Sequence, residues 1–132
     1  MMECKPVTTP MDSGTKLVKT SGVKEEDQQL PYRELVGALT YLSTMTRPDI
    51  AFAVRNLSQF NNCYSTEHWK GAKRVLRYLK GTSNLGLVYK SKSGNLEGFV
   101  DADWGNNIED RKSYSGYLFS LGGSAISWYS RK

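Results

Sequence analysis

The amino-acid sequence predicts an α+β fold in which a small three-helix subdomain is followed by an antiparallel β-sheet. Between residues 31 and 82, apolar residues recur at the spacing of amphipathic helices. From residue 83 to 132, the pattern changes to short segments rich in aromatic and β-branched residues, separated by turn-forming residues. Because these connections are too short for crossovers, neighbouring strands are expected to be antiparallel.

Residues 1–30 are predicted to form an extended arm or a linker. They contain Pro6, Pro10, several serines and threonines, and charges of both signs. No sustained apolar period of a helix or a strand runs through them. The helical pattern begins at Pro31.

The first predicted helix is PYRELVGALTYLSTM, which is opened by Pro31, a residue suited to the first helical turn. Its apolar stripe consists of four residues at helical spacing: Leu35, Val36, Leu39 and Leu42. The helix should end before Pro48, because proline disfavours helical geometry in the residue that precedes it.

A second helix is predicted from Pro48, with Asp49 near its positively polarised end. Its apolar face consists of Ile50, Ala53, Val54, Leu57 and Phe60. A third helix begins near Ser65 or Thr66, either of which can cap it, and ends at Gly81. His68 in its first turn is expected to be a partly buried neighbour of the cap.

Four strands are predicted from the segments LGLVYKS, LEGFVDADW, SYSGYLFSL and SAISWYS. The connections between them are SKSGN, GNNIEDRK and GGS. Gly122 and Gly123 in the last connection predict a hairpin turn.

The chain of 132 residues carries a formal net charge of +5, which favours an anionic partner such as nucleic acid. No apolar run approaches the roughly 20 residues that span a bilayer, and the start, MMECKPVTTP, lacks the apolar core of a secretory signal. We therefore expect an intracellular protein, cytoplasmic or nuclear, with no membrane partner. Cys4 and Cys63 have no CxxC partner, so neither a disulfide framework nor a zinc knuckle is predicted.

One face of the third predicted helix is basic. The residues on this basic face are Lys70, Lys73, Arg74, Arg77 and Lys80, and no acidic residue interrupts them. Several lysines and arginines on one helix face can neutralise phosphates, which gives salt-dependent affinity for nucleic acid. These five are the candidate nucleic-acid-binding residues, and the alternative is a solvated helix face without a ligand.

Asp101 and Asp103 lie two residues apart at the end of a predicted strand. Strand alternation places both carboxylates on one face, where they could hold a hard cation such as Mg²⁺. Two-metal phosphodiester chemistry needs further carboxylates, because the two cations must be held roughly 3.5–4 Å apart. Spacing alone favours the other interpretation, in which the two aspartates cap the following GNN turn.

Several segments, in order and nearly end to end, resemble the Pol polyprotein of copia-type LTR retrotransposons. They are CKPVTTPMDSGTKL, YRELVGALTYLSTMTRPDIAFAV, LSQF, HWKGAKRVLRYLKGT, GLVY and DADWGNNIEDRKSYSGYLFSLGGSAISWYSRK. TRPDI, RVLRYLKGT and DADW are specific in combination. Mild departures occur at Cys63, where proline is common, at Gly105, where alanine is common, and at Tyr114, where threonine is usual.

The resemblance implies that residues 31–82 correspond to the thumb and connection of a reverse transcriptase, which grips the template–primer. Residues 83–132 would then be the N-terminal strands of an incomplete RNase H-like domain. Asp101 would be the catalytic residue and first metal ligand, Asp103 a further candidate ligand, and Mg²⁺ the cofactor. The implied partners are an RNA–DNA hybrid or other nucleic acid and the remainder of the Pol polyprotein.

The family's YVDD-like polymerase aspartates and the glutamate of its EAEY-like segment do not occur in the sequence. We therefore expect a fragment of a reverse transcriptase and ribonuclease H polyprotein that is inactive alone. One alternative is a non-catalytic nucleic-acid-binding module or relic that uses the basic third helix. Another is a translated gene fragment with no selected activity.

Overall fold

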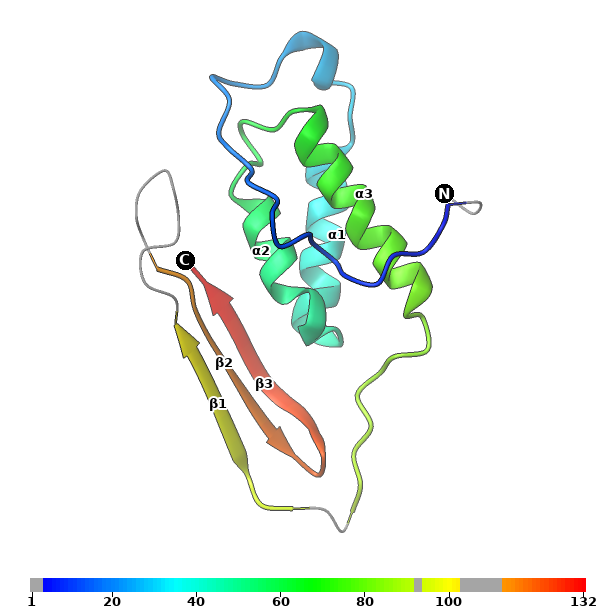
Figure 1. The fold of residues 1–132 in the computed structure, drawn as a ribbon, viewed down its shortest axis with the longest axis vertical. Coiled ribbons are helices and arrows are strands. Elements are labelled where there is room, and N and C mark those ends of the chain that lie inside the picture. The colour runs from blue at the N-terminus through cyan, green and yellow to red at the C-terminus, as the bar shows by residue number, and fades with distance from the viewer. Residues whose placement is uncertain (1–3, 92–93, 103–112) are drawn as a thin grey trace.

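The structure is a computed structural model that describes residues 4–91, 94–102 and 113–132. A unit of three α-helices precedes a three-stranded antiparallel sheet, and the sheet lies along one side of the helices (Figure 1). The predicted α+β fold is therefore confirmed. Among the residues that the structure describes, no helix has both the length and the apolar character needed to cross a membrane.

The helical unit is built from elements that begin where the sequence indicates. Its α-helices are α1 (Tyr32–Met45), α2 (Ala51–Ser58) and α3 (Thr66–Gly81), and 3₁₀ helices at η1 (Glu25–Asp27) and η2 (Pro48–Ile50) precede the first two. Pro31 is the N-cap of α1, Pro48 opens η2, and Ser65 is the N-cap of α3. The predicted starts of all three helices and the end of the third at Gly81 are confirmed.

The core lies where the three helices meet. The predicted apolar face of the second helix is confirmed, because all five of its residues are buried. On α1 the buried side chains are Tyr32, Val36, Leu39 and Ser43, whereas Leu42 is exposed, so placing Leu42 in the core was wrong. The buried residues follow the stripe that begins at Tyr32, whose ring stacks on that of Tyr64 with centroids 4.7 Å apart, and Leu42 lies to one side of this stripe.

The inner face of α3 contributes several residues to the core. Ala72, Val75 and Tyr78 are buried, and Trp69, Leu76 and Leu79 are partly buried against the core. His68 is fully buried rather than partly buried, and its Nδ1 accepts a hydrogen bond of 3.1 Å from the Ser65 main-chain N–H. The basic residues of α3 therefore lie away from the centre of the core.

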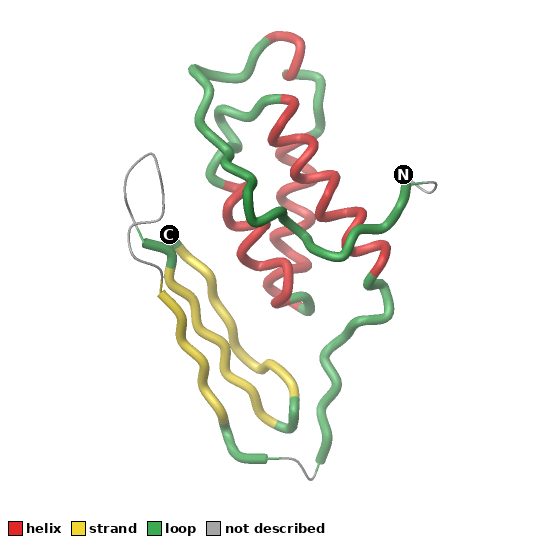
Figure 2. The backbone as a smooth tube through the Cα atoms, viewed as in Figure 1, coloured by secondary structure: helices red, strands yellow, loops and turns green. Residues whose placement is uncertain are grey.

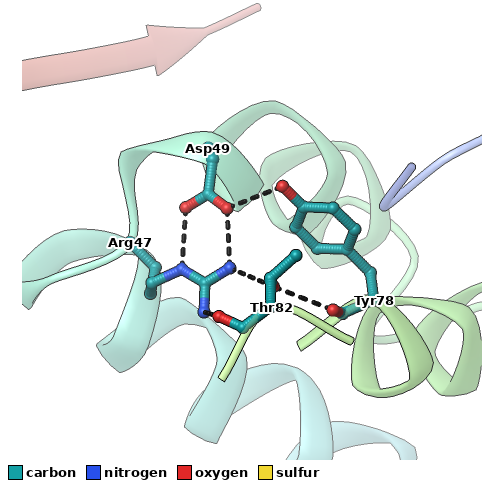
Figure 3. A network of polar contacts seen from close by, with 4 residues as sticks. All are labelled: Arg47, Asp49, Tyr78 and Thr82. Carbon is teal, nitrogen blue, oxygen red and sulfur yellow. Dashed lines mark hydrogen bonds and ion pairs between the residues drawn. The ribbon is translucent and has the colours of Figure 1, made fainter. Parts of the chain in front are cut away.

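A polar network ties the start of η2 to the end of α3 (Figure 3). The Arg47 Nε and Nη2 atoms donate to the two carboxylate oxygens of Asp49 at 2.9 and 2.7 Å. Tyr78 donates its hydroxyl to the same carboxylate at 2.9 Å, and Arg47 also donates to the side-chain oxygen of Thr82 at 2.6 Å. The segment TRPDI is thus a structural joint between helices.

The sheet contains β1 (Glu97–Ala102), β2 (Ser115–Leu121) and β3 (Ser124–Arg131) in the order β1-β2-β3, with both pairs antiparallel. Figure 2 shows these strands in yellow beside the red helices. Gly122 and Gly123 form the turn between β2 and β3 with φ angles of 64° and 79°. Glycine tolerates such positive φ angles, and the predicted hairpin is confirmed.

The first of the four predicted strands, LGLVYKS, is not a strand in the structure, so this prediction was wrong. Residues 85–90 form an irregular connection between α3 and the sheet rather than a strand. The Lys90 main-chain N–H donates to the Gly122 carbonyl at 2.9 Å, and the Tyr89 hydroxyl donates to the Ala125 carbonyl at 2.6 Å. These contacts place the connection beside the hairpin turn, at the end of β2 and β3 rather than along them.

Candidate nucleic-acid interface and carboxylate site

The basic face predicted from the sequence lies on α3, the helix farthest from the sheet (Figure 1). Lys70 and Lys80 are exposed, and Lys73, Arg74 and Arg77 are partly exposed. The buried residues of α3 fall between them in the sequence, at the spacing of an amphipathic helix. All five basic side chains are therefore displayed by one rigid element.

An arm segment, residues 4–12, runs along this basic face. Lys80 Nζ donates to the Cys4 carbonyl at 3.0 Å, and Arg77 Nε donates to the Lys5 carbonyl at 2.8 Å. Figure 1 shows the N-terminal part of the chain in dark blue passing across α3. The C-terminal half of the basic face is thus in contact with main-chain carbonyl groups of the arm segment.

Arg74 extends these contacts towards the middle of α3. Its Nη2 atom lies 2.7 Å from a carboxylate oxygen of Asp12 and donates to the Thr9 hydroxyl at 3.0 Å. The arm segment therefore supplies one carboxylate and several neutral oxygen atoms to three consecutive cationic side chains of the face. Each of these groups is an acceptor, as a phosphate oxygen would be.

Apolar contacts also hold the N-terminal arm, including the arm segment itself, against the helices. Val7, Met11 and Leu17 pack against the core, and a Cβ atom built on Gly81 would lie only 2.9 Å from the Cβ of Pro6. Further along, the Thr20 hydroxyl donates to the Cys63 carbonyl at 2.8 Å. Residues 4–30 therefore form a bound arm along the helical unit.

Lys70 and Lys73 make their contacts within α3. Lys70 forms an ion pair of 2.7 Å with Glu67, and the Lys73 ammonium lies 5.7 Å from the centre of the Trp69 ring. The ring of Trp69 and the carbonyl of Lys5 carry no net charge. Lys73 contacts the first of these groups and Arg77 contacts the second. The positive charges of these two side chains are therefore not neutralised by a carboxylate of the part of the chain that the structure describes.

Asp101 lies near the end of β1, opposite Gly116 of β2, with its side chain exposed. By strand alternation it shares a face with Phe99, whose partner across the sheet is Leu118. Leu118 is in turn paired with Trp128, which contacts α1, so this face is turned towards the helices. Asp103 lies outside the described residues.

The described residues do not assemble a Mg²⁺ site. Among residues 4–91, 94–102 and 113–132, no group of three or more His, Cys, Asp or Glu side chains is placed to hold a metal ion. Asp101 supplies one carboxylate, whereas Mg²⁺ is held by several oxygen ligands. The predicted ligand pair of Asp101 and Asp103 stays a prediction.

The structure separates the two predicted sites. Asp101 is on β1, the strand at the edge of the sheet, whereas β3 at the other edge lies against α2. The basic face belongs to α3 on the far side of the helical unit (Figure 1). The two features therefore cannot act on the same phosphate group.

A cavity between the helices and β3 was not indicated by the sequence. It has a volume of about 250 Å³ and its polar lining includes Ser43, Thr44, Arg55, Ser58 and Ser130. The hydroxyls of Ser43, Thr44 and Ser58 donate to carbonyl groups of their own helices. They are therefore already engaged as donors and do not form a prepared anion site.

Thr9 and Asp12 are interface residues that the sequence pattern did not identify. Both lie in an irregular segment, and their partner Arg74 is far away along the chain. A threonine or an aspartate in a linker gives no signal of the helix that it will contact. Only the three-dimensional arrangement identifies them.

Comparisons with known proteins identify relatives along the whole chain. No family model matches the sequence, and no solved structure does. The chain is similar to the retrovirus-related Pol polyproteins from transposons RE2 and RE1 of Arabidopsis thaliana, at 44% and 46% identity over 100% of its length. It spans 9% of the length of each of these polyproteins.

A shorter relative is the secreted RxLR effector protein 161 of Plasmopara viticola. It is 47% identical over 106 residues, which cover 80% of this chain and 75% of that protein. The similarity to the polyproteins is of comparable strength and extends over the entire sequence.

Proposed function

This chain belongs to the family of Pol polyproteins of copia-type retrotransposons, and from this membership we propose that it grips an RNA–DNA hybrid and has no cleavage activity of its own. In this proposal residues 31–82 act as the thumb and connection of a reverse transcriptase. Residues 83–132 are the first strands of an RNase H-like domain. The succession of three helices and an antiparallel sheet supports this division.

The observation that carries the proposal is the basic face of α3. Its side chains project from a helix whose opposite side is fixed in the core by Ala72, Val75 and Tyr78. Lys73 and Arg77 carry charge that the described carboxylates do not balance. Such an array attracts the phosphates of either strand through counterion release, without reading the base sequence.

The proposed absence of cleavage rests on the carboxylates. Asp101 is the proposed first ligand for Mg²⁺, and a metal bound there would activate a water for phosphodiester hydrolysis. The described residues form no group of three or more His, Cys, Asp or Glu side chains that could hold a metal ion with it. We propose that the remaining ligands come from other parts of the polyprotein.

A binding assay with matched charge changes tests the proposal. Fluorescence anisotropy with a labelled RNA–DNA hybrid is measured over a series of salt concentrations for the wild type, K73A/R77A and K24A/R55A. Both double variants remove two positive charges, but only the first removes them from the basic face. We expect K73A/R77A to bind more weakly, with the slope of log K against log salt reduced by about 1 for each phosphate that the protein no longer neutralises.

Two results would count against the proposal. If the two double variants lose affinity equally, net charge and not the basic face determines binding. If the wild type cleaves the hybrid in the presence of Mg²⁺ and Asp101→Asn abolishes that cleavage, the chain is a nuclease by itself. The cleavage assay is read on a denaturing gel with the same hybrid.

The outer face of the sheet supports a second part of the proposal, that the chain packs against the remainder of a Pol polyprotein. Val100 is 79% exposed, and Tyr117, Phe119 and Tyr129 are also exposed on this face. The Tyr117 ring lies 5.5 Å from Phe119 and 5.9 Å from Tyr129, measured between centroids. A contiguous apolar surface of this kind commonly marks a protein contact.

In the intact polyprotein, we expect slower amide hydrogen exchange in β1 and β2 than in the isolated chain. Equal exchange rates would contradict the proposed packing.

A further inference from the structure

We propose that the arm segment is an intramolecular competitor for the basic face of α3, so that nucleic acid binds fully only after residues 4–12 are displaced. This inference rests on the proposed function, because it names the regulation of the same face. The arm segment would lower the affinity of the resting chain and make binding a two-step process.

The first argument is the chemistry of the contacts. The N–H groups of Arg74, Arg77 and Lys80 are directed at oxygen acceptors of the arm segment at distances of 2.7 to 3.0 Å. Phosphate oxygens would be recognised by the same N–H groups. An N–H that donates to Asp12 or to the Lys5 carbonyl cannot donate to a phosphate with the same geometry, so the two ligands exclude each other.

The second argument is the path of the arm segment. Cys4 contacts Lys80 near the C-terminal end of α3, whereas Asp12 contacts Arg74 near its middle. The arm segment therefore runs antiparallel to α3 and covers the C-terminal part of the basic face. Lys70 and Lys73 make their contacts within α3 itself. Nucleic acid can approach these two residues first and then extend along the helix as the arm segment leaves.

The third argument is that these contacts are easy to exchange. The hydrogen bonds from Arg74, Arg77 and Lys80 to the arm segment are exposed to solvent, and the Asp12 side chain is 60% exposed. Exposed ion pairs contribute little to stability and are screened by salt. The polar contacts can therefore be exchanged at low cost, whereas Val7 and Met11, which pack on the edge of the core, leave it when the arm segment is displaced.

The fourth argument is that the displaced segment stays close. Thr20 is hydrogen-bonded to Cys63, and Asp27 accepts a hydrogen bond of 2.7 Å from the Thr66 hydroxyl at the start of α3. These anchors hold the arm beyond residue 12 against the helical unit. A tethered segment has a high effective concentration at its own site, so weak contacts are sufficient for competition.

A matched pair of charge variants of the full chain gives the first test. D12N removes the carboxylate that contacts Arg74, and E26Q removes an exposed carboxylate elsewhere in the arm, beside Lys24. Both raise the net charge equally. We expect D12N to bind the RNA–DNA hybrid about twofold to fivefold more tightly than E26Q, in line with the removal of one exposed ion pair.

A reversible lock gives the second test. In a C4S/C63S background, P6C/G81C introduces two thiols where the Pro6 Cβ and a Cβ on residue 81 lie 2.9 Å apart. A small shift brings them to the roughly 3.8 Å of a disulfide. We expect the oxidised form to bind the hybrid at least about tenfold more weakly than the reduced form, because the arm segment can no longer leave. The C4S/C63S parent should bind equally under both conditions.

The outcomes separate this inference from the proposed function. If D12N and E26Q bind equally and oxidation of P6C/G81C has no effect, while K73A/R77A still weakens binding, the competitor inference is overturned and the proposed function stands. If the wild type, D12N and reduced P6C/G81C all fail to bind hybrid at low salt, both are overturned. Circular dichroism of each variant establishes that the helices are intact.

Discussion

Trp128 of β3 donates its indole N–H to the main-chain carbonyl of Ser43 in α1 over 2.7 Å. Ser43 lies in the last turn of α1, which ends at Met45, and the final carbonyl groups of a helix lack partners within it. The contact therefore supplies a donor to one of these carbonyl groups and attaches the sheet to the helices at the same time.

Replacing this indole should loosen the sheet from the helical unit. We expect Trp128→Phe to lower the free energy of unfolding by about 1 kcal/mol for the missing hydrogen bond, and by more if the smaller ring packs poorly. Urea denaturation followed by circular dichroism measures the change. Trp69→Phe makes the same chemical change on α3, without this hydrogen bond, and is the control. An equal effect in both variants would show that the hydrogen bond to Ser43 is not the cause.

The ion pair of Arg47 and Asp49 makes stability depend on pH in the acidic range. Burial raises the pKa of Asp49, but the hydrogen bonds from Arg47 and Tyr78 lower it by more than burial raises it. The pKa of Asp49 in the folded protein therefore lies below its ordinary value. The unfolded chain then binds a proton at higher pH than the folded one. The stabilisation is present above the ordinary aspartate pKa of about 4 and is lost as pH falls through the lower, folded pKa.

Asp49→Asn should therefore flatten the acid limb of the stability curve. We expect the variant to be less stable than the wild type at pH 7, because the Arg47 guanidinium loses its carboxylate partner. The difference between the two should shrink as pH falls below about 4. Thermal unfolding at a series of pH values tests this, and a difference independent of pH would contradict it.

Two glycines in helices should respond differently to alanine. A Cβ on Gly37, in α1, would meet nothing within 4 Å, so Gly37→Ala should stabilise the chain by about 0.5–1 kcal/mol through helix propensity. A Cβ on Gly81 would lie 2.9 Å from the Cβ of Pro6 and must push the arm segment aside. We expect little gain or a loss of stability from Gly81→Ala, measured by urea denaturation, and a similar gain in both variants would show that Pro6 yields freely.

Tyr32 should contribute to the decline in stability of the folded protein at alkaline pH. Burial, and to a lesser extent the charge of Cys63, raise the pKa of its phenol well above the ordinary value of 10.0. The unfolded chain therefore loses this proton at lower pH than the folded one, so the stabilisation is present below pH 10 and declines as pH rises further.

Tyr32→Phe should reduce this alkaline decline. At neutral pH we expect the free energy of unfolding to fall by about 1 kcal/mol, because the hydrogen bond of 2.9 Å from the Tyr32 hydroxyl to the Leu57 carbonyl is lost. That carbonyl keeps the Phe60 N–H as a donor. Tyr41→Phe, at a residue that is 66% exposed, is the control and should leave both properties unchanged. Urea denaturation at pH 7 and near pH 11 provides the comparison. Identical unfolding curves for Tyr32→Phe and the wild type would refute a role of the Tyr32 hydroxyl in stability.

The sequence was most informative where the physical signal is local. Pro31, Pro48 and Ser65 mark helix starts because their preference depends on their own backbone, and all three predictions are confirmed. The inner face of α1 was partly misassigned because Leu42 has the same spacing as a core residue. Which of two overlapping stripes faces inward depends on Tyr64, a partner from another part of the chain.

The same limit applies to the candidate site. The basic face could be predicted, because five residues of one helix are related by a fixed period. Its contacts with Cys4, Lys5 and Asp12 could not, because an irregular segment has no period and its partners are far along the chain. The segment 85–91 was predicted as a strand from its composition, but a strand needs a neighbour that composition does not specify.

The path of the arm segment also decides where a reporter or tag can be attached. Cys4 lies beside Lys80, so a group attached to Cys4 is held at the last turn of α3. There it would shield or crowd the basic side chains and distort a binding measurement. The C-terminal end follows β3, away from α3 (Figure 1), so a fluorophore or affinity handle placed there leaves the helix accessible.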